Sequence, residues 1–320
     1  MRKKFFVIFR FLATAGIIFA LFKFIPYTQI VEVYKDSEKI YLILAFFTFV
    51  SSYIIGIFRW RFFLASLEIK VPLSELFYAF FSGLFFNLFF PSYVAGDVFR
   101  GVSIAQRYGD RKKVASSVLM DRYSGASALV LMVVISVYVA GLLGRNLLQD
   151  GSVYIAVSIL ASLMAFSSLI IFSKPFFSLF TTLLKPESKL RIKVESFHDQ
   201  LLIFKNKPSI LLKSLFFSFP TQLLTAIGFF LASRAFSLDL SVLYFLILVP
   251  IVMGISLVPI TIAGAGTREA AAVYFFSLIG IDKSIGLGMS LLNFLFMVST
   301  GILGGIIYVS IYHRRLQPDT

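Results

Sequence analysis

The segment PSYVAGDVFR, residues 91–100, interrupts an apolar stretch that begins at residue 73. Proline removes a helical hydrogen bond and glycine tolerates dihedral angles that other residues avoid, so a helix over 73–90 should stop here. Irregular backbone at membrane depth is tolerated only inside protein or beside water. The break therefore predicts an interior turn, at the kind of place where a substrate binds.

A second break, PITIAGAGTRE at residues 259–269, repeats the first. Both contain P-x-x-x-A-G-x-x-x-R with identical spacing, as Pro91, Ala95, Gly96 and Arg100, and as Pro259, Ala263, Gly264 and Arg268. Each break follows an apolar run and precedes a shorter one. The match indicates an internal repeat.

The composition of the whole chain is that of a membrane protein. Hydrophobic residues make up 58% and charged residues only 14%, with a mean hydropathy of +0.90, whereas soluble proteins carry about 25% charged residues. A soluble globular enzyme is thereby excluded. Apolar runs of about 20 residues can cross a bilayer as helices, and such runs lie at 5–25, 40–58, 73–90, 115–142, 152–173, 209–233, 240–258 and 285–311. The first run has no small-residue cleavage site, so we expect a retained helix rather than a signal peptide.

The distribution of lysine and arginine indicates which runs cross the membrane, because cytoplasmic loops are enriched in both. Twenty-one of the 30 lie in five stretches: the N-terminus, 59–72, 97–117, 174–208 and the C-terminal tail. All five share one side only if 73–90 enters the membrane, breaks and returns. The same rule explains the net charge of +14, so this charge does not indicate that the protein binds nucleic acid.

The sequence therefore predicts an all-α polytopic membrane protein with about six spanning helices and two re-entrant broken-helix hairpins in an inverted-topology repeat. The first repeat is 1–150, with its hairpin at 73–107. The second is 151–320, with its hairpin at 240–280 and a charged cytoplasmic connector at 174–208 that should form an interfacial amphipathic helix. We expect both termini on the cytoplasmic side of the cell membrane. In secondary transporters, paired broken helices form a binding site near the bilayer midplane.

Charged residues at the two breaks are the first functional candidates, because charge inside a membrane is costly. Asp97 and Arg100 share a face if the return segment is helical, and Arg268 and Glu269 open the second return segment. A helix start favours anions, so a lipid phosphate is the expected ligand of the arginines, and the acids could hold a cationic headgroup or couple an ion. The structural alternative is that Asp97 caps the helix and Arg100 reaches the interface.

Other polar residues extend this set. Asn87 lies in the first hairpin arm and needs a hydrogen-bond partner in lipid. Asp121 and Arg122 are expected to form a structural ion pair or an interfacial anchor, and Arg59, Trp60 and Arg61 to anchor the second span at the interface. The candidate substrate-binding residues are Asn87, Ser92, Asp97, Arg100, Asp121, Arg122, Arg268 and Glu269. The structural breaks are Pro91, Gly96, Pro259, Gly264 and Gly266.

Several chemistries are not expected. The chain has no cysteine, and its two histidines, His198 in a charged loop and His313 near the C-terminus, have no acidic cluster at ligand spacing. We therefore expect no metal site, no cofactor and no catalytic residues, since phosphate-binding and dinucleotide motifs are missing as well.

The order of these residues resembles the flippase-like transmembrane family typified by the membrane domain of lysylphosphatidylglycerol synthase. The resemblance runs from about residue 5 to 311 and is carried by Arg59, Asn87, Pro91, Ser92, Gly96, Asp97, Arg100, Asp121, Arg122, Gly125, Pro259, Gly264, Gly266 and Glu269. Ala95 and Ala263 stand where the family pattern has a glycine. The resemblance implies movement of a lipid across the bilayer. The cytoplasmic aminoacyl-transferase domain of the full synthases is absent from these 320 residues, so we expect no lysyl transfer by this chain alone.

The leading hypothesis is thus a non-enzymatic flippase or transporter of a phospholipid or lipid-linked headgroup. One alternative is a membrane-embedded enzyme that uses Asp97 or Glu269 as base, although no nucleophile–base pair supports it. Another is a partner subunit for a separate transferase. The sequence does not decide whether the protein forms a homo-oligomer.

Overall fold

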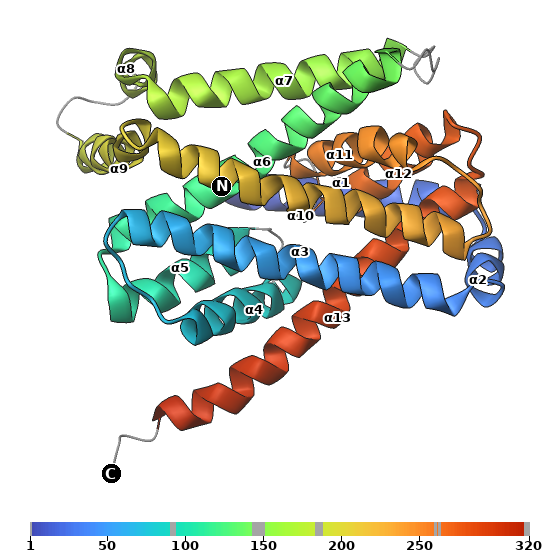
Figure 1. The fold of residues 1–320 in the computed structure, drawn as a ribbon, viewed down its shortest axis with the longest axis horizontal. Helices are drawn as coiled ribbons and strands as arrows, with labels where there is room; N and C mark the ends of the chain where they lie inside the picture. Colours follow the sequence, from blue (N-terminus) through green and yellow to red (C-terminus); the bar gives the residue numbers. More distant parts are fainter. Residues whose placement is uncertain are drawn as a thin grey trace.

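Apolar stretches of 20 or more residues form long helices, because in lipid a helix satisfies its backbone hydrogen bonds within one segment. The computed structural model describes residues 2–89, 94–142, 151–182, 188–258, 261 and 264–316. Every regular element in these ranges is an α-helix (Figure 1). The helices are α1 (Arg2–Phe24), α2 (Tyr27–Lys35), α3 (Lys39–Ser66), α4 (Leu73–Phe89), α5 (Val94–Tyr108), α6 (Arg111–Leu142), α7 (Gly151–Phe172), α8 (Lys174–Thr181), α9 (Lys189–Lys205), α10 (Pro208–Ala235), α11 (Val242–Leu257), α12 (Thr267–Ser277) and α13 (Lys283–Leu316).

Five of these helices, α3, α6, α7, α10 and α13, are long and apolar enough to cross a membrane. A sixth candidate is the pair formed by α1 from Leu12 onward and α2, which is bent by 73°. The predicted all-α polytopic fold class is therefore confirmed. The apolar helices α4 and α11 have 17 and 16 residues and rise about 25 Å, which is less than the ~30 Å of a hydrocarbon core.

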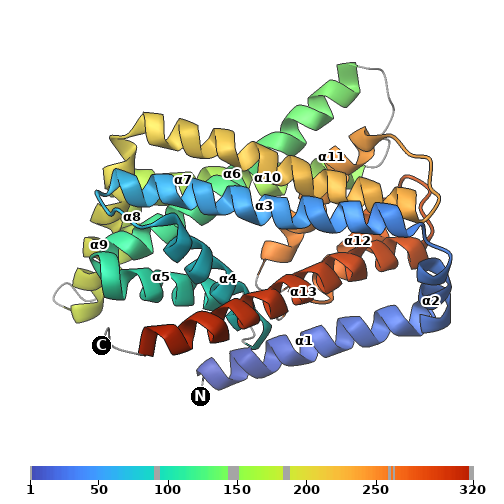
Figure 2. The ribbon, with the colours of Figure 1, turned by 60° about the horizontal axis from the view of Figure 1, so that its bottom comes forward.

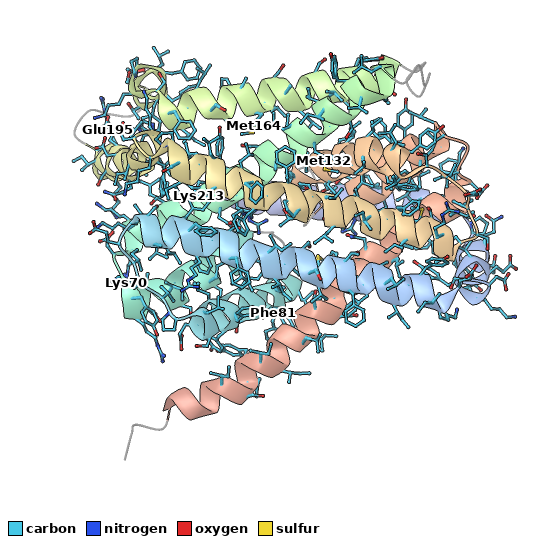
Figure 3. All side chains as sticks on the ribbon, in the orientation of Figure 1. Lys70, Phe81, Met132, Met164, Glu195 and Lys213 are labelled. Carbon is cyan, nitrogen blue, oxygen red and sulfur yellow. The ribbon has the colours of Figure 1, made fainter. Side chains whose placement is uncertain are left out.

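The helices α4 and α5 form a hairpin that returns to its own starting end of the molecule (Figure 1). The helices α8 and α9 and the C-terminal end of α13 lie at this same end in both ribbon views, whereas α2 lies at the other (Figures 1 and 2). Lys70, which precedes α4, and Glu195, on α9, also mark this end (Figure 3). This is the arrangement that the charge distribution predicts for a re-entrant hairpin.

The two hairpins pack across the halves of the chain. The helix α4 packs against α13, α11 packs against α6, and α3 and α10 form the most extensive helix pair. Glycine permits the close approach of α4 and α13, because a Cβ atom on Gly304 would collide with the carbonyl oxygen of Phe81. Gly301 and Gly305 lie against the side chains of Leu88 and Phe85 on α4. The division into two repeats stays a prediction, and residues 143–150 at its boundary lie outside the described ranges.

The predicted connector 174–208 contains two helices, α8 and α9. His198, expected in a charged loop, is instead buried on α9. Its ring stacks on Phe177 of α8, with centroids 3.7 Å apart, and its Nε2 lies 2.9 Å from the carbonyl oxygen of Ile170 on α7. The histidine therefore joins three consecutive helices.

Candidate functional site

A cavity of about 310 Å³ lies among eight helices, α3 to α6 and α10 to α13. Six of the predicted binding residues line it: Asn87, Asp97, Arg100, Asp121, Arg122 and Arg268. Glu269 is not among the lining residues. Ser92, together with the predicted breaks Pro91 and Pro259, lies outside the described residues.

The first break is closed by Asn87 and two glycines. The backbone N–H of Gly96 donates to Asn87 Oδ1 over 2.7 Å, which supplies the partner that the sequence required for this asparagine. A Cβ atom on Gly83 would come within 2.7 Å of the carbonyl oxygen of Gly96, so α4 and the start of α5 approach closely only because both residues are glycine. Gly96, predicted as a break, lies in the first turn of α5, where it lets this helix pack against α4 beside the cavity.

Asp97 and Arg100 lie one turn apart on α5, and the predicted shared face is confirmed. Arg100 Nε donates to Asp97 Oδ1 over 3.0 Å, and the second oxygen of Asp97 accepts from Arg122 Nε over 2.6 Å. Arg122 keeps 48% of its side chain exposed, whereas that of Arg100 is 4% exposed. Asp97 therefore links a buried arginine to an exposed one.

Asp121, on α6, joins two buried arginines. Its Oδ1 accepts from Arg59 Nε over 2.6 Å and its Oδ2 from Arg100 Nη2 over 2.8 Å. The sequence suggested that Asp121 and Arg122 form an ion pair or an interfacial anchor. The structure corrects this interpretation, because the pairs are Asp121 with Arg59 and Arg100, and Arg122 with Asp97.

The prediction that Arg59 and Trp60 anchor a span at the interface is wrong. Both are buried, and Trp60 has no exposed surface. Trp60 Nε1 donates to Ser117 Oγ over 3.1 Å, and the Arg100 guanidinium lies 4.6 Å from the Trp60 ring centroid. Gly125 leaves room for Arg59, since a Cβ atom there would lie 3.2 Å from Nη1. Asp121 is the only acid in the apolar run 115–142, and a buried acid in such a run was the signal that an arginine of another helix meets it.

The second break is built around Glu269. Gly266 precedes α12 with a φ of 88° and donates its N–H to Glu269 Oε2 over 2.6 Å. Glu269 Oε1 accepts from Arg268 Nε over 3.0 Å. Gly264 also has a positive φ, 66°, and lies against Ser256. Positive φ favours glycine, which agrees with the predicted breaks at Gly264 and Gly266, while Glu269 ties the start of α12 to Arg268.

The charge of the site does not balance. Four arginines (Arg59, Arg100, Arg122 and Arg268) meet three carboxylates (Asp97, Asp121 and Glu269), which leaves one positive charge. The buried Nη1 of Arg100 has no hydrogen-bond partner in the described residues. A buried donor without an acceptor is costly, and an anionic oxygen would satisfy it. Within the same described ranges there is no group of three or more histidine, aspartate or glutamate residues that could hold a metal ion.

Comparison with known families gives a match over most of the chain. The family model described as the lysylphosphatidylglycerol synthase TM region matches residues 7–305. The match includes both breaks and every residue of the site. Among proteins with curated functions, none matches the chain.

Proposed function

The chain belongs to the family of the lysylphosphatidylglycerol synthase TM region, and from this premise we propose that it moves a lipid with an anionic phosphate headgroup across the membrane. The observation that carries the proposal is the excess positive charge of an ion network that lines a cavity among apolar helices. Uncompensated charge is costly inside a membrane and tends to mark a substrate path. A lipid phosphate brings the missing negative charge.

In this proposal the aspartates hold the arginines in place and the headgroup binds between them. Asp121 fixes Arg59 and Arg100, and Asp97 links Arg100 to the exposed Arg122. Arg122 meets the headgroup first and Arg100 binds it at depth. The acyl chains stay in the lipid, and the headgroup crosses through the cavity. The transport is non-enzymatic, since the candidate bases Asp97 and Glu269 already hold arginines.

We also propose that the two halves form an inverted-topology repeat in the cytoplasmic membrane, with both termini in the cytoplasm. Two features support it. Each hairpin packs on the last long helix of the other half. The basic stretches 59–72, 97–117 and 174–208 lie at one end of the molecule (Figures 1 and 2). Broken helices in inverted repeats place substrate sites near the midplane.

This topology can be tested by cysteine labelling, because the native chain has no cysteine. Gln106→Cys, at an exposed position on α5, should be labelled only from the cytoplasmic side. Asp239→Cys, between α10 and α11, should be labelled only from outside. Its exposed ion pair with Arg234 is worth at most about 1 kcal/mol, so the substitution should not disturb the fold. Labelling of Gln106→Cys from outside would contradict the re-entrant hairpin, because a fully crossing 73–90 places residues 97–117 on the outer side.

Transport can be tested by blocking the cavity. Thr225 on α10 lines it, whereas Ile155 on α7 is exposed and lies away from it. In vesicles containing purified Thr225→Cys, a charged methanethiosulfonate reagent should stop the transfer of fluorescent phosphatidylglycerol between leaflets. The same reagent on Ile155→Cys should leave the rate unchanged. The proposal would be contradicted if the unmodified protein transferred no lipid. It would also be contradicted if fully labelled Thr225→Cys protein still transferred lipid at the unlabelled rate.

A further inference from the structure

The short helix α8 turns away from the end of α7. Ser173 separates the two helices, and its Oγ accepts from the backbone N–H of Phe176 over 3.4 Å. Pro175 lies in the first turn of α8, where a proline fits because the N–H that it lacks has no helical partner there. Figure 1 shows α7 lengthwise and α8 nearly end-on. Because α7 is long and apolar enough to cross a membrane, this turn places α8 along the membrane surface.

The helix α8 has one packed side and one exposed apolar side. On the packed side, Thr181 is buried and the ring of Phe177 stacks on His198 of α9. On the other side, Leu179 and Phe180 are 64% and 42% exposed. The contact with α9 fixes the orientation of α8, so these two apolar side chains face outward.

The exposed side of α8 continues the outer surface of α7. The ring centroid of Phe166, on α7, lies 5.7 Å from that of Phe176 and 6.0 Å from that of Phe180. Phe166 is itself exposed, as are Ile159 and Leu163 on the preceding turns of α7. Exposed apolar side chains on a spanning helix face lipid, so the surface that adjoins α8 is already a lipid-facing one. A bilayer therefore fits the exposed side of α8 better than a soluble protein does.

The charge of this region is positive. Residues 174–208 contain seven lysine and arginine residues and three acids. Lys174, at the start of α8, is 71% exposed and lies 3.2 Å from Asp199 of α9. Lys193, also exposed, forms no ion pair with the residues that the structure describes. Positive charge beside an exposed apolar helix face is the pattern that binds anionic bilayers.

We propose that α8 and the basic start of the connector form a binding surface for anionic phospholipids of the adjacent leaflet, separate from the cavity. Leu179 and Phe180 enter the acyl region beside the headgroups, and Lys174 attracts the lipid phosphates. Asp199 weakens this attraction because it neutralises Lys174. The described residues that line the cavity include none from α8 or α9. In the topology proposed above, this leaflet is the cytoplasmic one.

The depth of α8 can be measured with a fluorophore on a single cysteine of the full-length protein in vesicles of phosphatidylglycerol and phosphatidylcholine. On Leu179→Cys the fluorophore should be quenched by nitroxide-labelled acyl chains and protected from iodide in the water. Ser178→Cys is the matched control, because Ser178 is the neighbouring residue, is exposed and bonds only to the carbonyl oxygen of Pro175. Its fluorophore should show the reverse. Equal quenching by iodide at both positions would overturn the lipid contact and leave this surface to a soluble partner.

The preference for anionic lipid can be measured on the same labelled Leu179→Cys protein. At equal mole fraction, nitroxide-labelled phosphatidylglycerol should quench at least about twofold more than the phosphatidylcholine analogue at low salt. The ratio should approach one at about 1 M salt, where the screening length falls to about 3 Å. Lys174→Gln should lower the ratio and Asp199→Ala should raise it. Lys70→Gln, at an exposed position between α3 and α4, should leave it unchanged.

Two outcomes would contradict the preference. A ratio of one at low salt would overturn the binding of anionic lipid, and a ratio that neither Lys174→Gln nor Asp199→Ala changes would overturn the role of Lys174. Neither measurement depends on movement of lipid between leaflets. A failure of the proposed transport therefore leaves this inference standing, and the reverse also holds.

Discussion

Replacing Asp121 with alanine should destabilise the protein by about 3–5 kcal/mol, the cost of leaving a buried ion network without one partner. Asp121 is 2% exposed and holds Arg59 and Arg100 at once. Without it, Arg100 still pairs with Asp97. The buried Arg59 keeps, among the residues that the structure describes, only its hydrogen bond to Ser218 Oγ. The measurement is the unfolding midpoint of the purified protein in detergent.

The matched control is Asp199→Ala, which removes an ion pair of the same type at the surface. Asp199 lies 3.2 Å from Lys174, and both side chains are more than half exposed. Such pairs contribute at most about 1 kcal/mol, so this midpoint should hardly change. Adding Arg59→Met to Asp121→Ala should restore part of the lost stability, because the uncompensated charge is then gone. Equal midpoints for Asp121→Ala and Asp199→Ala would refute the buried network.

The overall architecture could be predicted because its causes act locally along the chain. Runs of apolar residues fix the helices, and the spacing of lysine and arginine requires that 73–107 return to its starting side. The Asp97–Arg100 pair was predictable too, since residues three apart on a helix are neighbours. Pro220 and Pro250 lie inside α10 and α11 without ending them. In a membrane bundle, groups on neighbouring helices can satisfy the backbone carbonyls that a proline leaves without a hydrogen bond.

Long-range partners could not be predicted in the same way. Arg59 and Asp121 are 62 residues apart, and nothing local distinguishes a buried arginine from one at the interface. The position of Trp60 beside Arg59 favoured the interface, and burial of both overturned that interpretation. Substrate binding by Glu269 stays a prediction. The contact that the sequence did not reveal is the one from the N–H of Gly266 to its carboxylate. That contact depends on the positive φ of Gly266, which glycine permits but does not require.

Arg100 should be the residue on which transport depends most. It pairs with both aspartates of the cavity, its Nη1 has no partner in the described residues, and its loss removes the excess positive charge. Arg100→Gln leaves Asp121 paired with Arg59 and Asp97 paired with Arg122, so the fold should persist. A hydrogen bond to a charged group is worth roughly 1.5–3 kcal/mol, which corresponds to a loss of about ten- to a hundredfold.

The most direct measurement is the rate at which phosphatidylglycerol changes leaflets in vesicles that contain equal amounts of folded wild-type, Arg100→Gln, Arg100→Lys or Arg61→Gln protein. Arg61 lies two residues from Arg59 on α3 but is exposed, so it controls for the loss of a positive charge outside the cavity. We expect Arg100→Gln to fall about ten- to a hundredfold, Arg100→Lys to fall less because it keeps the charge, and Arg61→Gln to match the wild type. A rate for Arg100→Gln equal to that of Arg61→Gln would contradict transport through this cavity.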